Sequence, residues 1–222
     1  MNPARSLLTG AVRAAARLRR ARTFHPAGAM CVGFATLGDE DLPLRSGAVT
    51  LRISKGLGTP GGLPDIVGVA VRLQTSSPGG SADGDWDVLL AGRMPGLGPL
   101  PVPAPARTWH DVPLSSISRF RYDGEDWRID GRLLVPRLSG GLSVPRLRGR
   151  LLRANGVLAL GARGRSGSTR PLGIVNFTAE AAGSDLRFDP VRAVPDGVRP
   201  VPDWLARLRA DAYRASRDAC TG

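Results

Sequence analysis

Hydrophobic residues alternate with polar or small residues along several short stretches of this chain, which is the pattern of half-buried β-strands. In residues 49–54 Val, Leu and Ile alternate with Thr, Arg and Ser, and residues 69–74 repeat the pattern. Turns rich in Gly and Pro separate the stretches. The pattern predicts strands over Ala29–Leu37, Ala48–Ser54, Ile66–Thr75, Trp86–Ala91, Trp127–Pro136, Gly156–Arg163, Gly173–Thr178 and Leu186–Phe188.

Two stretches near the ends of the chain have the composition and spacing of helices. Ala, Leu and Arg, which have high helix propensity, dominate residues 4–22. Residues 203–217 follow Pro202, begin with Asp203 as an N-terminal cap, and place apolar residues three or four positions apart. Between the strands, the Pro- and Gly-rich stretch 92–113 predicts a loop across one end of a barrel.

Length and composition fit one mainly β (β+α) domain. A chain of 222 residues can bury a single hydrophobic core, and all-β barrels of this size commonly form one unit. Plentiful Gly and Pro and few aromatic residues favour many short strands joined by tight turns. We therefore expect one domain over 1–222, with an N-terminal helix or arm at 1–22, an antiparallel β-barrel at 23–190 and a C-terminal helix at 200–219.

The formal net charge of +12 at pH 7 comes almost entirely from arginine, because Lys55 is the only lysine. The arginines are scattered along the chain rather than concentrated beside aromatic residues, so specific nucleic-acid binding is not predicted. Two cysteines, Cys31 and Cys220, do not make a disulfide framework, which favours a reduced, cytoplasmic protein. No run reaches the roughly 18 apolar residues that span a bilayer, so no membrane partner is expected.

One glycine pattern matches a nucleotide-binding motif, but its surroundings argue against that function. Gly56, Gly58 and Gly61 fit the dinucleotide-binding fingerprint after a predicted strand. The motif requires a helix that begins there and directs its N-terminus at the pyrophosphate. Because Pro60 and Pro64 disfavour such a helix, we predict a turn without a nucleotide site.

The predicted C-terminal helix carries a pair of residues with chemical meaning. Arg209 and Tyr213 are four positions apart and share one helical face. A guanidinium beside a phenol favours the phenolate, which is a recognised axial ligand of haem iron. Taken alone, this pairing is more often a surface contact. Its interpretation depends on the rest of the chain.

Segments in order along the chain resemble motifs of the catalase family. Arg22-Thr-Phe-His25-Pro-Ala-Gly28 is similar to the family's distal-histidine motif. Val49-Thr-Leu-Arg52-Ile-Ser54 resembles the strand that supplies an Arg and a Ser to the haem pocket. Further segments with the family's order and spacing are Pro64–Leu73, Asp85–Leu89, Ala179–Glu180, Phe188–Pro190, Gly197, Pro202–Asp203 and Arg209–Tyr213.

The resemblance implies a catalase-like antiparallel β-barrel that binds haem b, with Tyr213 on the C-terminal helix as the iron ligand. It implies that His25 acts as general base and acid on a bound peroxide, and that Ser54 orients the imidazole by a hydrogen bond. Arg22 and Arg52 would pair with the haem propionates, because a guanidinium presents a planar fork to a carboxylate.

The chain also departs from the family pattern. Arg209 would tune Tyr213, whereas Arg217 would contact a propionate from a spacing that differs from that of the family's arginine. The family's distal asparagine is missing from residues 89–95, where Arg93 is the candidate substitute. The chain is also shorter than a typical catalase, which implies a more open pocket. Peroxidase-like chemistry on hydrogen peroxide or organic hydroperoxides is therefore favoured over full catalase activity.

Three functions stay open at this point. The first is a haem-dependent oxidoreductase, which could assemble as a homo-oligomer. The second is a catalytically inactive barrel that carries or senses haem. The third is a basic protein that binds nucleic acid or another anion, which steeply salt-dependent binding would reveal.

Overall fold

The computed structural model describes residues 28–38, 42–76, 84–94, 102–116, 118–180, 186, 188–190 and 193–201. The strands of this part of the chain are β1 (Gly28–Leu37), β2 (Gly47–Lys55), β3 (Val67–Thr75), β4 (Gly84–Gly92), β5 (Val112–Ser116), β6 (Arg119–Tyr122), β7 (Glu125–Leu134), β8 (Gly156–Arg163), β9 (Thr169–Ala179) and β10 (Arg199–Val201). The helix is α2 (Val144–Leu151). None of the helices in the described ranges is long and apolar enough to cross a membrane.

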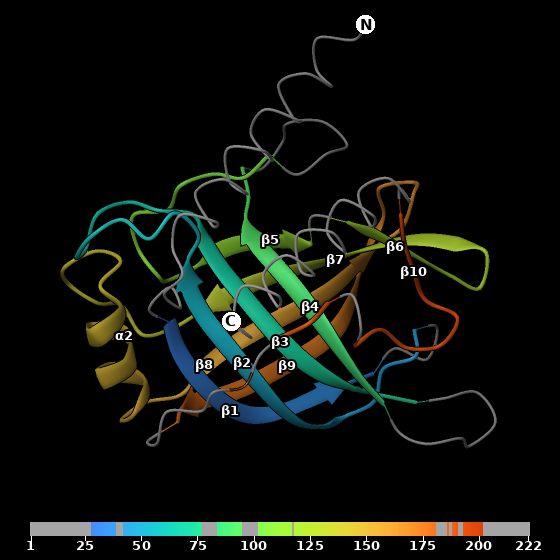
Figure 1. The fold of residues 1–222 in the computed structure, drawn as a ribbon, viewed down its shortest axis with the longest axis horizontal. Helices are drawn as coiled ribbons and strands as arrows, with labels where there is room; N and C mark the ends of the chain where they lie inside the picture. The colour runs from blue at the N-terminus through green and yellow to red at the C-terminus, as the bar shows by residue number, and fades with distance from the viewer. Residues whose placement is uncertain are drawn as a thin grey trace, which may run out of the picture.

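Eight of the described strands close into an antiparallel β-barrel, which confirms the predicted barrel. The order around it is β1, β2, β3, β4, β5, β7, β8 and β9, and β9 pairs again with β1. Strand β6 forms a hairpin with β7, and β10 adds to β6 outside the closed barrel. Figure 1 shows β2, β3 and β4 crossing in front of β8 and β9, with α2 at one side of the barrel.

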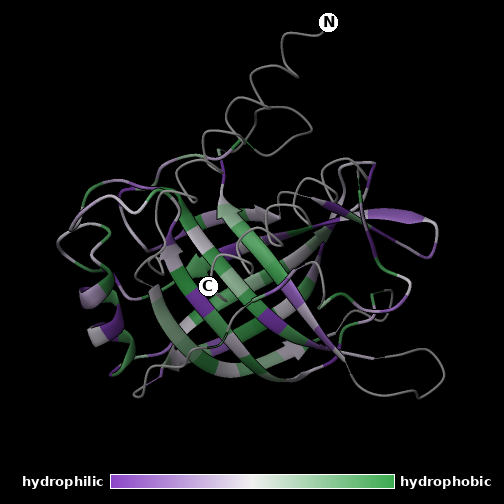
Figure 2. Ribbon diagram, in the orientation of Figure 1, coloured by the Kyte–Doolittle hydropathy of each residue, from purple (hydrophilic) through white to green (hydrophobic). Residues whose placement is uncertain are grey.

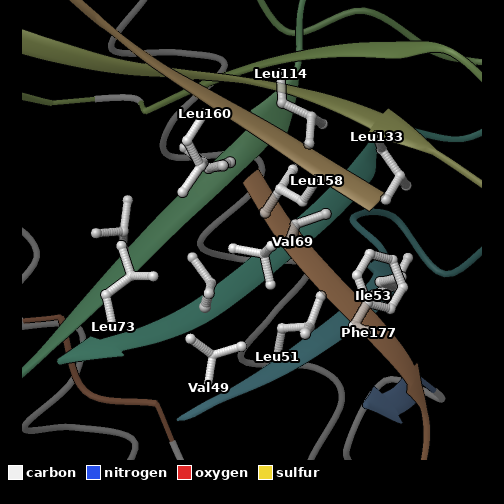
Figure 3. Packing of buried hydrophobic residues seen from close by; sticks show 14 of the residues in the cluster. Val49, Leu51, Ile53, Val69, Leu73, Leu114, Leu133, Leu158, Leu160 and Phe177 are labelled. Atoms are coloured by element: carbon white, nitrogen blue, oxygen red, sulfur yellow. The ribbon is translucent and has the colours of Figure 1, made fainter. Parts of the chain in front are cut away.

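Alternating side chains fill the barrel with a hydrophobic core. On β2, Val49, Leu51 and Ile53 are buried, whereas Thr50, Arg52 and Ser54 between them are half-buried on the outer face. The same alternation runs along β3, and Figure 2 shows it as alternating colours along the front strands. Figure 3 shows side chains from β2, β3, β5, β7, β8 and β9 meeting in the interior. The packed interior leaves the outer wall and the ends of the barrel for binding.

Seven of the eight predicted strands are confirmed, with shifts at their ends, as β1, β2, β3, β4, β7, β8 and β9. The prediction of a strand at 186–188 is wrong, because Leu186 and Phe188 lie outside every strand. Strands β5, β6 and β10 and helix α2 were not predicted, and β5 begins inside the predicted 92–113 loop. The predicted helices at 4–22 and 203–217 lie outside the described residues.

The glycine-rich segment after β2 forms a loop and no helix, as predicted. Asp65 is fully buried and accepts hydrogen bonds from the backbone amides of Leu57 and Thr59 at 2.8 and 2.7 Å. The ammonium of Lys55 donates to the carbonyls of Gly61 and Leu63 at 3.0 and 3.1 Å. The loop therefore wraps two buried charged groups, Asp65 and Lys55.

Candidate functional site

The outer face of β2 carries the two predicted site residues that the structure describes. Arg52 and Ser54 alternate with buried Leu51 and Ile53, so both side chains lie outside the barrel, and both are half-buried. The other predicted site residues lie outside the described part of the chain, and they are Arg22, His25, Arg209, Tyr213 and Arg217.

Two rows of outward-facing residues cross β1 to β4 around Arg52 and Ser54. The first row consists of successive register partners Gly28, Ser54, Gly68 and Ala91. The second row consists of Met30, Arg52, Ala70 and Leu89. We call these eight positions the β1–β4 wall. All are half-buried, whereas Val32 and Phe34 further along β1 are 39% and 54% exposed.

Glycines leave room for the polar side chains of the wall. A Cβ atom on Gly28 would stand 2.7 Å from Nε of Arg52, so a side chain at residue 28 would force the guanidinium to shift. A Cβ atom on Gly68 would stand 3.3 Å from the hydroxyl of Ser54. Burial lowers the pKa of Arg52, and an anionic neighbour would favour its charged form.

Hydrogen bonds beside the wall hold the chain segment that precedes β10, and we call the residues that make them, Arg72, Asp87 and Asp189, the Asp87 clip. Buried Asp87 accepts hydrogen bonds from Nε and Nη2 of Arg72 at 2.7 and 2.8 Å and from the amide of Asp189 at 2.7 Å. The amide of Asp87 donates to the carbonyl of Ala193 at 2.9 Å. Arg72 also lies over the ring of Phe188, 5.7 Å from its centroid. Asp87 therefore joins β4 directly to the segment that precedes β10.

The wall has no amide side chain where the family's distal asparagine is expected. Leu89 and Ala91 occupy the outward positions at this end of β4. Arg93, the candidate substitute, directs its guanidinium toward Asp130, with Nη2 3.9 Å from Oδ2. The polar groups of the wall are therefore those of Arg52 and Ser54.

No known protein family, curated protein or solved structure matches this chain. Within the described ranges, no group of three His, Cys, Asp or Glu side chains could hold a metal ion directly. A haem site needs a protein side chain as ligand to the iron, and the predicted ligand, Tyr213, lies outside the described residues. Within the described residues, the candidate site is therefore the β1–β4 wall.

Proposed function

We propose that the protein binds haem b against the β1–β4 wall and acts as a peroxidase-like oxidoreductase on hydrogen peroxide or organic hydroperoxides. The observation that carries the proposal is the placement of Arg52 and Ser54 on one outer face, where their register partners on β3 are the small residues Ala70 and Gly68. Gly28, three residues after His25 in the sequence, is the register partner of Ser54. This pairing supports a role for Ser54 beside the His25 imidazole.

The described residues fit a haem in two respects. Gly28, Gly68, Ala70 and Ala91 contribute at most a methyl group each, whereas the larger Met30 and Leu89 stand at the two ends of the second row. A flat macrocycle therefore meets least obstruction over the middle of the wall, on β2 and β3. The half-buried guanidinium of Arg52 suits a carboxylate, because charge-assisted hydrogen bonds are stronger where water is scarce. A haem propionate is such a carboxylate.

The residues of the chain would divide the work as follows. Bound haem supplies the redox chemistry that cleaves the O–O bond. His25 takes a proton from the peroxide and returns it to the leaving oxygen, while Ser54 holds the imidazole in place. Tyr213 would hold the iron as a phenolate, which the charge of Arg209 would favour. Reduction would convert an organic hydroperoxide to an alcohol and water, or hydrogen peroxide to two waters, and a reducing cosubstrate would supply the two electrons and two protons that this consumes. The proposed propionate contacts are Arg22, Arg52 and Arg217.

Titration of the purified protein with hemin tests haem binding. We expect a saturable Soret band with one haem per chain, and its loss or shift in Tyr213→Phe. Tyr122→Phe is the matched control, because Tyr122 is the only other tyrosine and lies on β6, away from the wall. Equal Soret spectra for Tyr213→Phe and the unaltered protein would remove Tyr213 as the ligand.

Peroxide turnover tests the role of His25. His25→Ala should keep the Soret band and lose about 100-fold or more in the rate of peroxide reduction, a typical loss for general acid–base catalysis. His110→Gln, which replaces the only other histidine, should keep both properties. Haem binding without turnover in the unaltered protein would instead identify a carrier or sensor. Absence of haem binding together with steeply salt-dependent polyanion binding would identify the basic binding protein.

A further inference from the structure

A second group of polar side chains lies on the outer face of β7 and its neighbours. Asp130 on β7 faces outward, two residues beyond Arg128, and Arg128 is the register partner of Arg163 on β8. Ser115 on β5 is the register partner of Asp130. Figure 1 shows β7 and β8 behind β2 and β3, so this group lies on a different side of the barrel from Arg52.

Asp130 is 8% exposed, and its oxygens are already engaged by near neighbours. The hydroxyl of Ser115 donates to Oδ1 at 2.6 Å, and Nε of Arg163 donates to Oδ2 at 2.8 Å. Nη2 of Arg163 also contacts Oδ2. Arg93 approaches the same oxygen at 3.9 Å, which is an ion pair but too long for a hydrogen bond.

Arg128 is the most buried arginine beside this carboxylate, and three further arginines lie near it. Arg128 is only 3% exposed. Burial lowers its pKa to about 10, the charges of Arg119, Arg163 and Arg93 lower it too, and Asp130 opposes them. Three other guanidiniums therefore lie within electrostatic range of Arg128. We call Arg93, Arg119, Arg128 and Arg163 the arginine cluster.

Arg93 and Arg119 carry donors that their described neighbours do not satisfy. Arg93 also shares its carboxylate, because Asp130 is already hydrogen-bonded by Arg163. Asp126, the other carboxylate in range of Arg119, is already bound by Arg121 through Nε at 2.7 Å and Nη2 at 3.2 Å. Within the described part of the chain, Nε of Arg93 and Nη1 of Arg119 are buried and have no hydrogen-bond partner. A buried donor without an acceptor costs about 1–3 kcal/mol.

We propose that the arginine cluster is a binding site for the oxyanion group of a small molecule, either a carboxylate or a phosphate. Such a group supplies acceptors for Arg93 and Arg119, and guanidinium forks match the geometry of both oxyanions. The side chains of Arg93 and Arg163 are 23% and 26% exposed, so the site is open to solvent at those two residues. Asp130 then holds Arg163 and limits the affinity for the anion.

The proposal is independent of haem, so its test uses haem-free protein. Sodium phosphate and sodium hexanoate are titrated separately, with sodium chloride at equal ionic strength as the reference. The arginine Nε–Hε signals in ¹H–¹⁵N NMR spectra report contact at Arg93 and Arg119. We expect saturable shifts of these signals with one of the two oxyanions, and the tighter binder identifies the class of ligand.

Two substitutions that should weaken oxyanion binding and one that should strengthen it distinguish a binding role from a structural role. Arg93→Gln and Arg119→Gln should each weaken oxyanion binding about tenfold or more, the effect of losing one charge-assisted hydrogen bond. Asp130→Asn should strengthen it, because the competing carboxylate is removed. Arg132→Gln is the matched control, since Arg132 faces outward on the same strand but is exposed and pairs with Asp111.

Shifts with phosphate and hexanoate that equal those with chloride would overturn the proposal. So would Arg93→Gln and Arg119→Gln proteins that bind as tightly as the Arg132→Gln protein. Should Asp130→Asn fail to fold, the two arginine variants decide the question by themselves.

Discussion

At the scale of single residues, Asp65 is the buried carboxylate that shapes the loop between β2 and β3. Burial acts to raise its pKa, but hydrogen bonds from the amides of Leu57, Thr59 and Ile66 and from the Thr59 hydroxyl outweigh burial and lower it. The folded pKa is thus below the unfolded value of about 3.9. The stability that Asp65 contributes is present above that value and is lost as the pH falls through the folded pKa.

Asp65→Asn should therefore lower the free energy of unfolding at pH 7 by about 2 kcal/mol, the cost of weakening buried hydrogen bonds. Below pH 4 the difference from the unaltered protein should shrink. Urea unfolding between pH 2 and 7 measures both effects, with exposed Asp123→Asn as control. An unchanged difference across this range would show that Asp65 does not titrate as argued.

Lys55 is the second buried charge of this loop and the only lysine. Its ammonium bridges the carbonyls of Gly61 and Leu63. Lys55→Met keeps the apolar stem and removes the donors, so it should lower the free energy of unfolding by about 1–3 kcal/mol. Denaturant unfolding at pH 7 is the measurement. A loss below about 0.5 kcal/mol, the range of neutral surface changes, would mean that water satisfies the two carbonyls equally well.

At the scale of elements, the alternation of apolar and polar residues predicted the long strands but not the short ones. Strand β2 could be read from its sequence because Val49, Leu51 and Ile53 recur at every second position. Strand β5 contains Pro113 within a Pro-rich stretch, and β6 is too short to show a period. The turn signal Asp123-Gly124, where both residues have positive φ, was the available indication of the β6–β7 hairpin.

The candidate sites were predictable only in part, for a related reason. Arg52 and Ser54 share a strand, so their common face follows from the sequence. The arginine cluster draws Arg93, Arg119 and Arg163 from three separate places in the chain, and they meet only because β6 and β8 both pair with β7 and Arg93 reaches Asp130 on β7. The contact between Asp87 and Asp189 likewise joins positions 102 residues apart.

The Asp87 clip should control how firmly the segment before β10 is held to β4. In Asp87→Asn the ion pair with Arg72 is lost and the acceptor for the Asp189 amide is weakened. We expect about tenfold or faster amide exchange at Asp189, equivalent to about 1.4 kcal/mol, while Val71 in β3 keeps its protection. Hydrogen–deuterium exchange measures this.

Asp85→Asn is the matched control for the clip, because Asp85 is half-exposed and lies 3.8 Å from the same guanidinium. It should leave exchange at Asp189 unchanged. Equal effects of the two substitutions would mean that Arg72, not the Asp87 carboxylate, anchors the segment.

At the scale of the whole molecule, stability depends on a core that every barrel strand shares. Leu158 on β8 is fully buried in that core, whereas Leu152 after α2 is 46% exposed. Leu158→Ala should lower the free energy of unfolding by about 2–5 kcal/mol through lost burial and a cavity. Leu152→Ala should change it by less than about 0.5 kcal/mol. Urea unfolding of both variants compares them, and similar losses would contradict a single shared core.

The proposed function places haem on the outer wall of the barrel over β2 and β3. Ferric haem is paramagnetic, so it broadens the NMR signals of nearby methyl groups. In protein with ¹³C-labelled alanine methyls, hemin should broaden Ala70 on the β1–β4 wall and leave Ala159, on the outer face of β8, sharp. Zinc protoporphyrin, which is diamagnetic, should broaden neither. Hemin that broadens Ala159 and spares Ala70, or that broadens neither methyl, would contradict the account.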